Sequence, residues 1–305
     1  MLPTHASHPA KASLAGKVWF VGAGPGSDDL LTVRAVRILD RADVVLHDAL
    51  LSDEVLDWAP QALHVPVGKR CGLPSLSQNE IGRLLVEHAR NHAVVVRLKG
   101  GDPAVFGRLD EEIDALEAAD LDWEIVPGVT AASAAAAAAG HSLTRRELAR
   151  HLTIATPRVA QDGRMAEGWA RALDPGGTAV LYMAGGLAAQ SAQALKARGF
   201  EGRTPVIAVH AASWSDQQIT RLTLDDLDRA GLPPDPRPVV LLIGQALGVR
   251  EPVTTKGPQR WNATPKIREA RLQSLTTTAI VAADPLENPR RSEESPVPSA
   301  QPVPT

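Results

Sequence analysis

Short apolar runs recur along the chain, and most of them are rich in β-branched side chains. Runs of this kind predict buried strands when Gly, Pro, Asn or Asp residues bound them. The predicted strands are Lys17–Val21, Val44–Leu46, Leu63–Val67, Val94–Leu98, Trp123–Val126, Leu152–Ala155, Thr178–Met183, Pro205–Ala211 and Val239–Ile243.

Between these runs, apolar residues repeat at the spacing of an α-helix. Ser77 followed by Glu80 predicts a capping box at the start of one such helix. The residues from Thr130 to Ala139 are nearly all small, which favours a helix that packs closely on its neighbours. The predicted helical segments are 30–39, 78–88, 113–119, 130–139, 165–172 and 188–198.

Strands that alternate with helices indicate an α/β fold with a largely parallel sheet. The composition changes after Gly128, so we expect two α/β domains, residues 14–128 and 129–250, around a cleft that holds a ligand. Residues 1–13 are expected to be a disordered lead-in. Residues 251–305, rich in Pro, Ser and charge, are expected to be mostly disordered.

Two glycine-bearing loops follow predicted strands. In VVVRLKGGDPAVFGR (94–108) an apolar run breaks into Gly100, Gly101 and Asp102, where backbone can approach a ligand closely. The earlier loop, Gly22–Gly26, reads G-A-G-P-G and departs from the dinucleotide fingerprint G-x-G-x-x-G. Pro25 also lacks the amide that a pyrophosphate would use. A nicotinamide oxidoreductase is an alternative that rests on this loop alone.

Composition narrows the function classes. The chain has 305 residues, 44% hydrophobic and 22% charged, with a net charge of -3. Aromatic residues make up 3%, so nucleic acid is an unexpected partner. The single Cys71 excludes an intrachain disulfide and fits a reducing, cytoplasmic compartment. No apolar stretch has the length of a membrane span, and no metal site is predicted.

Several segments together carry a family resemblance. In order they are VGAGPGSDDLLTVRA (21–35), VVLHDALLS (44–52), VGKR (67–70), VVRLKGGDPAVFGR (95–108), VPGVTAAS (126–133), LTRRELAR (143–150) and YMAG (182–185). This set resembles the tetrapyrrole methyltransferases that use S-adenosylmethionine. The segments VGKR and RLKGGDPAVFGR favour the branch that methylates uroporphyrinogen III. The resemblance implies two α/β domains around a cleft, a cytoplasmic homodimer, and formation of precorrin-2 for siroheme or cobalamin synthesis.

The resemblance also implies roles for single residues. Asp48 and Lys69 match positions for proton transfer, although a turn Asp and a solvated Lys are the alternative interpretation. Asp102 alternatively forms a turn, and Met183 alternatively packs in a core. The positions that match contacts to the methyl donor are Pro25, Gly100, Gly101, Asp102, Val105, Thr130, Ala131, Met183 and Ala212.

Uroporphyrinogen is a polycarboxylate, so a site for it needs cations, preferably arginines for paired hydrogen bonds. The candidates are Arg70, Arg108, Arg145, Arg146 and Arg150, each of which is alternatively a surface residue. Two other functions stay open. One is a methyltransferase that acts on a later precorrin or another tetrapyrrole, and the other is a non-catalytic protein that binds S-adenosylmethionine.

Overall fold

The computed structural model describes residues 16–49, 51–68, 76–157, 165–166 and 168–248. The predicted disordered segments, 1–13 and 251–305, lie outside these residues. Two five-stranded sheets form the core of one compact unit of the chain. One sheet is built from residues 17–126 and the other from residues 152–243. The division into two domains at residue 128 stays a prediction.

The first sheet is entirely parallel, as the alternation of strands and helices predicts. Its strand order is β3-β2-β4-β1-β5, and each neighbouring pair is parallel. The central strand β4 is buried along nearly its whole length, which explains the apolar residues at four of its six positions. The strands are β1 (Lys17–Gly22), β2 (Val44–His47), β3 (Leu63–Pro66), β4 (Val94–Lys99) and β5 (Trp123–Val126).

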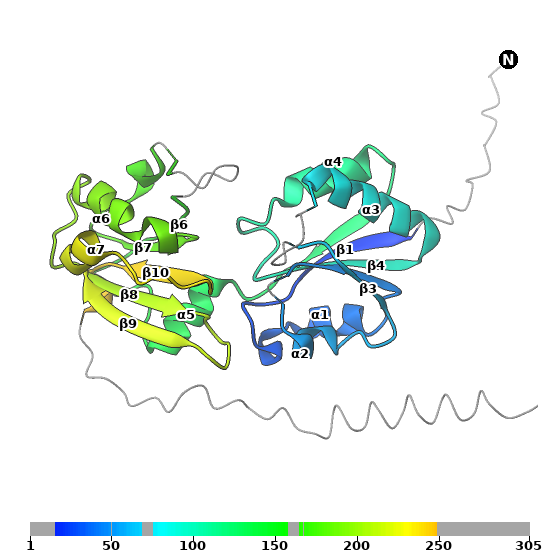
Figure 1. The fold of residues 1–305 in the computed structure, drawn as a ribbon, viewed down its shortest axis with the longest axis horizontal. Helices are drawn as coiled ribbons and strands as arrows, with labels where there is room; N and C mark the ends of the chain where they lie inside the picture. Colours follow the sequence, from blue (N-terminus) through cyan, green and yellow to red (C-terminus); the bar gives the residue numbers. More distant parts are fainter. Residues whose placement is uncertain (1–15, 50, 69–75, 158–164, 167, 249–305) are drawn as a thin grey trace, which may run out of the picture. The chain divides into compact units, whose positions relative to one another are not determined.

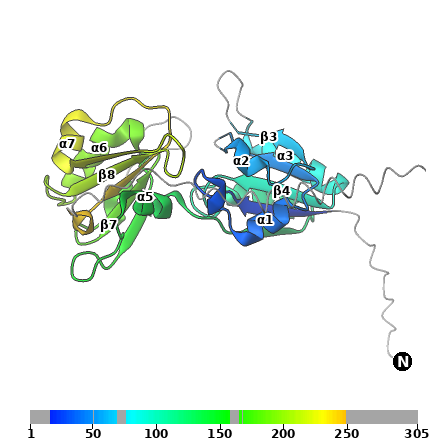
Figure 2. The same ribbon diagram turned by 90° about the horizontal axis from the view of Figure 1, so that it is seen from below.

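Helices cover both faces of this sheet (Figure 1). Phe20 and Leu46 belong to the core under α3 and α4, whereas Val45 and Leu98 belong to the core under α1 and α2. Figure 2 turns the molecule toward the α1 side. The predicted capping box is confirmed, because Ser77 and Glu80 each accept the other's backbone amide. These elements are η1 (Asp28–Leu30), α1 (Val33–Leu39), α2 (Asp53–Leu56), α3 (Gln78–Asn91) and α4 (Leu109–Glu117).

The second sheet is mixed. Its order is β6-β7-β10-β8-β9; β6 and β7 are parallel, and every other neighbouring pair is antiparallel. The edge strand β9 is absent from the sequence prediction, because most of its side chains are polar or half-exposed. The strands are β6 (Leu152–Ala155), β7 (Thr178–Tyr182), β8 (Pro205–His210), β9 (Gln218–Thr223) and β10 (Val239–Ile243).

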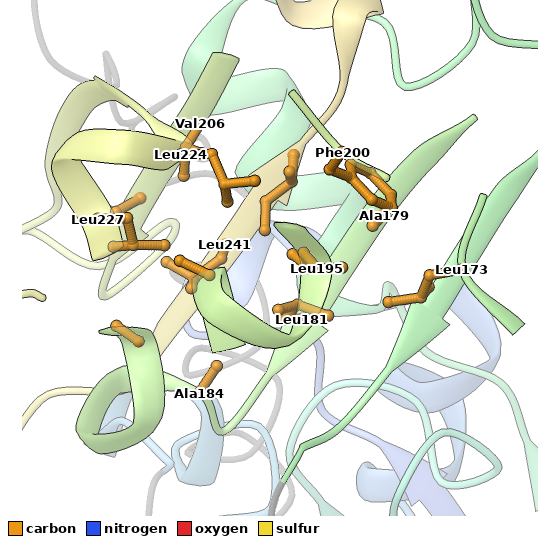
Figure 3. Packing of buried hydrophobic residues seen from close by; sticks show 14 of the residues in the cluster. Leu173, Ala179, Leu181, Ala184, Leu195, Phe200, Val206, Leu224, Leu227 and Leu241 are labelled. Carbon is orange, nitrogen blue, oxygen red and sulfur yellow. The ribbon is translucent and has the colours of Figure 1, made fainter. Parts of the chain in front are cut away.

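Two cores lie on the faces of this sheet. Figure 3 shows the core on the side of α6 and α7, where Leu181, Leu195, Leu227 and Leu241 pack together. The alanines of α5 pack on the opposite face against the strands. The helical prediction for 165–172 is wrong at Met165, Ala166 and Gly168; Gly168 has a φ of +68°, which no α-helix accommodates. The helical elements are α5 (Ala131–Ala139), η2 (Trp169–Ala172), η3 (Gly185–Leu187), α6 (Ala188–Lys196), α7 (Leu224–Ala230) and η4 (Gln245–Leu247).

Candidate active site

The two glycine-bearing loops lie side by side at the carboxyl ends of β1 and β4. The Gly101 amide donates to the Gly24 carbonyl at 2.7 Å, and the Gly24 amide donates back to Gly101 at 3.2 Å. Neighbouring parallel strands therefore bring together two loops that are far apart in the sequence. This edge of a parallel sheet is where such folds place ligands.

Glycine is required where these backbones touch. A Cβ on Gly128 would lie 2.2 Å from the Gly101 carbonyl oxygen, and one on Gly22 would lie 2.5 Å from the Gly128 Cα. Gly101 itself differs: it has a φ of +70°, and a Cβ there would meet nothing within 4 Å. The chain is therefore packed closely below this loop and open beside Gly101.

The loop's polar groups are partly committed to internal bonds. Asp102 accepts the amide of Ala104 at 2.8 Å and that of Gly128 at 2.9 Å, so it forms the turn that its residue type favours. The Gly100 amide donates to Asp48 at 3.3 Å. Because the amides of Gly100 and Gly101 both have acceptors within the chain, the two glycines offer a ligand open space rather than free amides, and Asp102 adds carboxylate lone pairs.

Asp48 follows β2 and lies at the same edge. Arg97 donates to its Oδ1 at 2.6 Å, and the Gly100 amide donates to its Oδ2. The side chain keeps 33% of its surface exposed. Asp48 is therefore more than an isolated turn residue, since a buried arginine and the glycine loop fix both of its oxygens.

Asp48 is the partly exposed end of a group of four charged residues, which we call the buried quartet after its three buried members: Asp48, Arg97, Lys99 and Glu112. Glu112 accepts Arg97 Nε at 3.1 Å and Lys99 Nζ at 2.9 Å, and its side chain is 0% exposed. Burial alone would lower the pKa of Arg97, but the charges of Asp48 and Glu112 hold that pKa above its ordinary value. Burial and the neighbouring Arg97 lower the pKa of Lys99.

Sequence reasoning missed Arg97, Lys99 and Glu112. A signal exists, because Arg97 and Lys99 interrupt an apolar strand on alternate positions, and Glu112 lies between the core residues Leu109 and Leu116. Charged residues are rarely buried unless they are paired. Charges placed inside predicted core elements therefore indicate partners, although they do not identify them.

Tyr182, the last residue of β7, connects several predicted donor contacts. Its hydroxyl lies 2.6 Å from the Thr130 hydroxyl and accepts the Ala132 amide at 2.6 Å, at the start of α5 beside Ala131. Burial raises the pKa of Tyr182 against the opposing effect of these hydrogen bonds. Its ring makes an edge contact with Phe106, whose centroid is 5.5 Å away. The loop after β4 and the end of β7 thus share one aromatic contact.

The loops after β7 and β8 are strained. Met183 has a φ of +57°, and Ala211 and Ser213, on either side of buried Ala212, have φ values of +47° and +69°. Non-glycine residues pay for such conformations with strain, which concentrates at functional sites. The Met183 side chain is 46% exposed, so the core-packing interpretation of this residue is wrong.

The loop after β8 contacts the first glycine loop. Trp214 Nε1 donates to the Pro25 carbonyl at 2.8 Å, and the Ser27 amide donates to the Ser213 hydroxyl at 3.1 Å. A Cβ on Gly26 would lie 2.2 Å from Trp214 Nε1. The third glycine of G-A-G-P-G is thus explained by the indole that packs on it, not by a phosphate. Pro25 and Ala212, both predicted donor contacts, belong to these two contacting loops.

A cavity of about 720 Å³ is lined in part by residues that follow Met183 or precede Ala212 by two positions in the chain. Its lining includes Gly185, His210, Pro233 and Asp235. His210 Nδ1 lies 3.3 Å from Asp235 Oδ2. The cavity is thus lined mainly by small and apolar residues, with one carboxylate–imidazole pair.

The family model of the tetrapyrrole (corrin/porphyrin) methylases matches residues 17–228. The chain belongs to this family. The methylase is 41% identical over 238 residues to uroporphyrinogen-III C-methyltransferase of Paracoccus denitrificans, which covers 77% of this chain and 83% of that protein. It is 39% identical to siroheme synthase 1 of Cronobacter sakazakii over 77% of this chain and 50% of that protein.

A solved structure of the same family agrees. Uroporphyrin-III C-methyltransferase from Thermus thermophilus, complexed with S-adenosylhomocysteine, superposes on the methylase with a TM-score of 0.66 at 36% identity, covering 76% of this chain and 94% of that chain. The expected fold class, α/β with the tetrapyrrole methylase architecture, is therefore confirmed, and the chain is a methyltransferase.

The predicted acceptor-binding arginines of the methylase are only partly placed. Arg108 forms two 2.7 Å hydrogen bonds to Glu111, which raise the pKa of Arg108. Arg145, Arg146 and Arg150 are exposed in the segment that follows α5. Lys69 and Arg70 lie outside the described residues. The structure thus brings Asp48 to the glycine loops but leaves the cationic part of the prediction untested.

In the part of the methylase that the structure describes, no group of three or more His, Cys, Asp or Glu side chains is arranged to hold a metal ion. Within the same residues, no helix is both long enough and apolar enough to cross a membrane.

Proposed function

We propose that this methylase transfers methyl groups from S-adenosylmethionine to ring carbons of uroporphyrinogen III, giving precorrin-2 through precorrin-1 for siroheme or cobalamin synthesis. One observation carries the proposal: Asp48 accepts the Gly100 amide at 3.3 Å, one residue from the Gly101–Gly24 pairing. A carboxylate suited to the acceptor and two loops suited to the donor thus meet at one sheet edge. The names of the relatives support this choice of acceptor.

The residues present fit the donor. Open space beside Gly101 admits a ligand against the backbone, and the exposed Met183 and half-buried Val105 offer apolar surface to an adenosyl group. Asp102 keeps lone pairs for an amine or a ribose hydroxyl after its two amide bonds. When bound, S-adenosylmethionine supplies an electrophilic methyl group on its sulfonium. Pro25, Gly100, Thr130, Ala131 and Ala212 complete the proposed donor contacts.

The chain's own residues position the acceptor and manage its proton. Alignment of the reacting atoms supplies most of the rate effect in a reaction of this kind. The attacked pyrrole carbon gains positive charge and then loses a proton, and the partly exposed Asp48 carboxylate stabilises that charge or takes the proton. By family resemblance, Lys69 takes part in proton transfer or holds an acceptor carboxylate, and Arg70, Arg108, Arg145 and Arg146 bind acceptor carboxylates.

The test compares two aspartates that flank β2. Asp48→Asn should lower kcat on uroporphyrinogen III by roughly 10²-fold or more, because a proton acceptor is lost. Its affinity for S-adenosylhomocysteine, measured by calorimetry, should stay within about twofold (roughly 0.4 kcal/mol). Asp43→Asn is the matched control: Asp43 accepts the amide of Val94, the first residue of β4, at 2.8 Å, whereas Asp48 accepts the amide of Gly100, just beyond the other end of that strand. Its kcat should be unchanged.

The acceptor is tested by offering labelled S-adenosylmethionine with uroporphyrinogen III or with later precorrins. Turnover confined to a later precorrin would replace the proposed acceptor. Donor binding without turnover on any tetrapyrrole would instead support the non-catalytic alternative. A thermal shift with NAD and none with S-adenosylhomocysteine would revive the oxidoreductase.

We also propose that the methylase is a cytoplasmic homodimer. The family resemblance supports the dimer, and the single Cys71 supports a reducing compartment. Light scattering on the purified chain, over a range of concentrations, measures the assembly; a monomer at all concentrations would contradict it.

A further inference from the structure

We propose that Arg97, Lys99 and Glu112 act together as a positioning network that fixes the Asp48 carboxylate against the glycine loop. The side chains of these three residues are at most 4% exposed, so they act through Asp48 rather than on a ligand. The inference therefore rests on the proposed role of Asp48 in the methyl transfer.

The geometry of Arg97 fixes the direction of its guanidinium. Nη2 donates to Asp48 Oδ1 at 2.6 Å, Nε donates to Glu112 Oε1 at 3.1 Å, and Nη1 donates to the Leu98 carbonyl at 3.1 Å. A planar group with three fixed partners cannot rotate without breaking several hydrogen bonds. The Gly100 amide holds the other Asp48 oxygen at 3.3 Å, so the carboxylate is fixed from two sides.

Lys99 and Glu112 fix Arg97 in turn. Glu112 is 0% exposed and Lys99 is 4% exposed, and their 2.9 Å contact gives the second Glu112 oxygen its own donor. The buried quartet contains two cations and two anions, so it is formally neutral. The Lys99 stem also reaches the loop, since a Cβ on Gly107 would lie 3.1 Å from Lys99 Cε.

Stability alone is a weak explanation for this network. Buried ion groups are often no more stabilising than apolar residues of the same volume, because removing charges from water opposes their attraction. The quartet lies under the loop between Gly100 and Gly107 and ends at a carboxylate that is 33% exposed. Its placement points to the orientation of Asp48 rather than to packing.

The test is Arg97→Lys, which keeps the charge and removes the planar fork. The full chain is assayed with uroporphyrinogen III and S-adenosylmethionine, and active sites are counted by S-adenosylhomocysteine titration. We expect kcat per site to fall by about tenfold or more, because moving a catalytic group by about 1 Å can lower the rate by roughly 10²-fold. The Kd of S-adenosylhomocysteine and the KM of the acceptor should stay within about twofold.

A double-mutant cycle separates positioning from a structural role. If Arg97 acts through Asp48, Arg97→Lys should lower kcat little further in an Asp48→Asn background, because interacting residues are not additive. Arg221→Lys is the control, since Arg221 donates to the Ala139 carbonyl at 2.9 Å and takes no part in the quartet. Its kcat should match that of the unmodified chain.

The results for Asp48→Asn and Arg97→Lys together distinguish the positioning network from the proposed function. Loss of kcat in Asp48→Asn with none in Arg97→Lys would overturn the positioning network and leave the proposed function intact. Unchanged kcat in Asp48→Asn would overturn both. Should Arg97→Lys fail to fold, the neutral variant Lys99→Met/Glu112→Leu leaves the Arg97–Asp48 pair alone. A severalfold lower kcat there supports the network, and an unchanged kcat overturns it.

Discussion

Glu111 and Glu112 are adjacent on α4, yet each forms a different kind of ion pair. Glu111 pairs with Arg108 at the surface, where the two side chains are 50% and 54% exposed. Glu112 is 0% exposed and accepts from Arg97 and Lys99. Successive helix residues point about 100° apart, so one carboxylate faces solvent and its neighbour faces the core. Sequence order alone therefore says little about what a charge does.

The difference in burial governs what each pair contributes. An exposed pair gains little, because water and salt screen it. A buried pair as a whole contributes little net free energy to folding, but removal of one partner leaves a buried charge without water or a counterion and is strongly destabilising. A third pair, Asp235 and Arg237, is intermediate, with side chains 18% and 24% exposed. The three pairs form a graded series that substitutions can test.

The largest effect is expected for Glu112→Gln. It leaves the two buried cations, Arg97 and Lys99, with only the partly exposed Asp48 carboxylate, which bonds Arg97 and not Lys99, so the free energy of unfolding should fall by about 3–5 kcal/mol. Urea unfolding followed by circular dichroism measures it. The control is Lys99→Met/Glu112→Leu, which removes one charge of each sign and should recover most of the loss. Equal losses in both variants would contradict the view that the unpaired charge is responsible.

The intermediate pair predicts a dependence on pH. Hydrogen bonds from Arg237 hold the pKa of Asp235 well below its ordinary value, and His210 faces the same carboxylate. The folded chain therefore binds this proton less tightly than the unfolded chain. The resulting stability is present above the unfolded pKa of about 4 and is lost as pH falls through the lower folded pKa.

Arg237→Gln removes the cause of that shift, so the midpoint of acid unfolding should move to higher pH. Circular dichroism during acid titration measures it. Arg203→Gln is the control, because Arg203 is 84% exposed beside Glu201 and should leave the midpoint unchanged. Equal midpoints for Arg237→Gln and the unmodified chain would show that this pair behaves like an exposed one.

The same contrast explains which parts of the molecule can be predicted from sequence. The strands of the first sheet and the Ser77 capping box follow from local patterns, because apolar runs and cap residues report on their own segment. The edge strand β9 and the helix α7 were not predicted. The capping box of Thr223 and Asp226 was an available signal for α7.

Contacts between distant segments were harder to predict. The family motifs predicted that Asp48, Gly101 and Met183 belong to the site, and the structure places Asp48 and Gly101 at one sheet edge. The partners of Asp48 could not be read from the sequence, because Arg97 and Glu112 meet only through the packing of β4 against α4. The hydrogen bond from Trp214 Nε1 to the Pro25 carbonyl likewise could not be read from the sequence, because these residues lie 189 positions apart in the chain.

The smallest effect is expected for Glu111→Gln at the exposed end of the series. The free energy of unfolding should change by about 0.5 kcal/mol or less, because both side chains are half in water. Release of Arg108 should nevertheless be visible in catalysis if that arginine binds an acceptor carboxylate. The Arg108 guanidinium would no longer have to leave the Glu111 carboxylate before it binds a carboxylate of the acceptor. The acceptor KM should therefore fall by roughly twofold, which corresponds to about 0.5 kcal/mol. Steady-state kinetics at low salt measures it. A KM that does not change, together with an unchanged KM in Arg108→Gln, would remove Arg108 from the acceptor site and leave the Arg108–Glu111 pair as a surface contact.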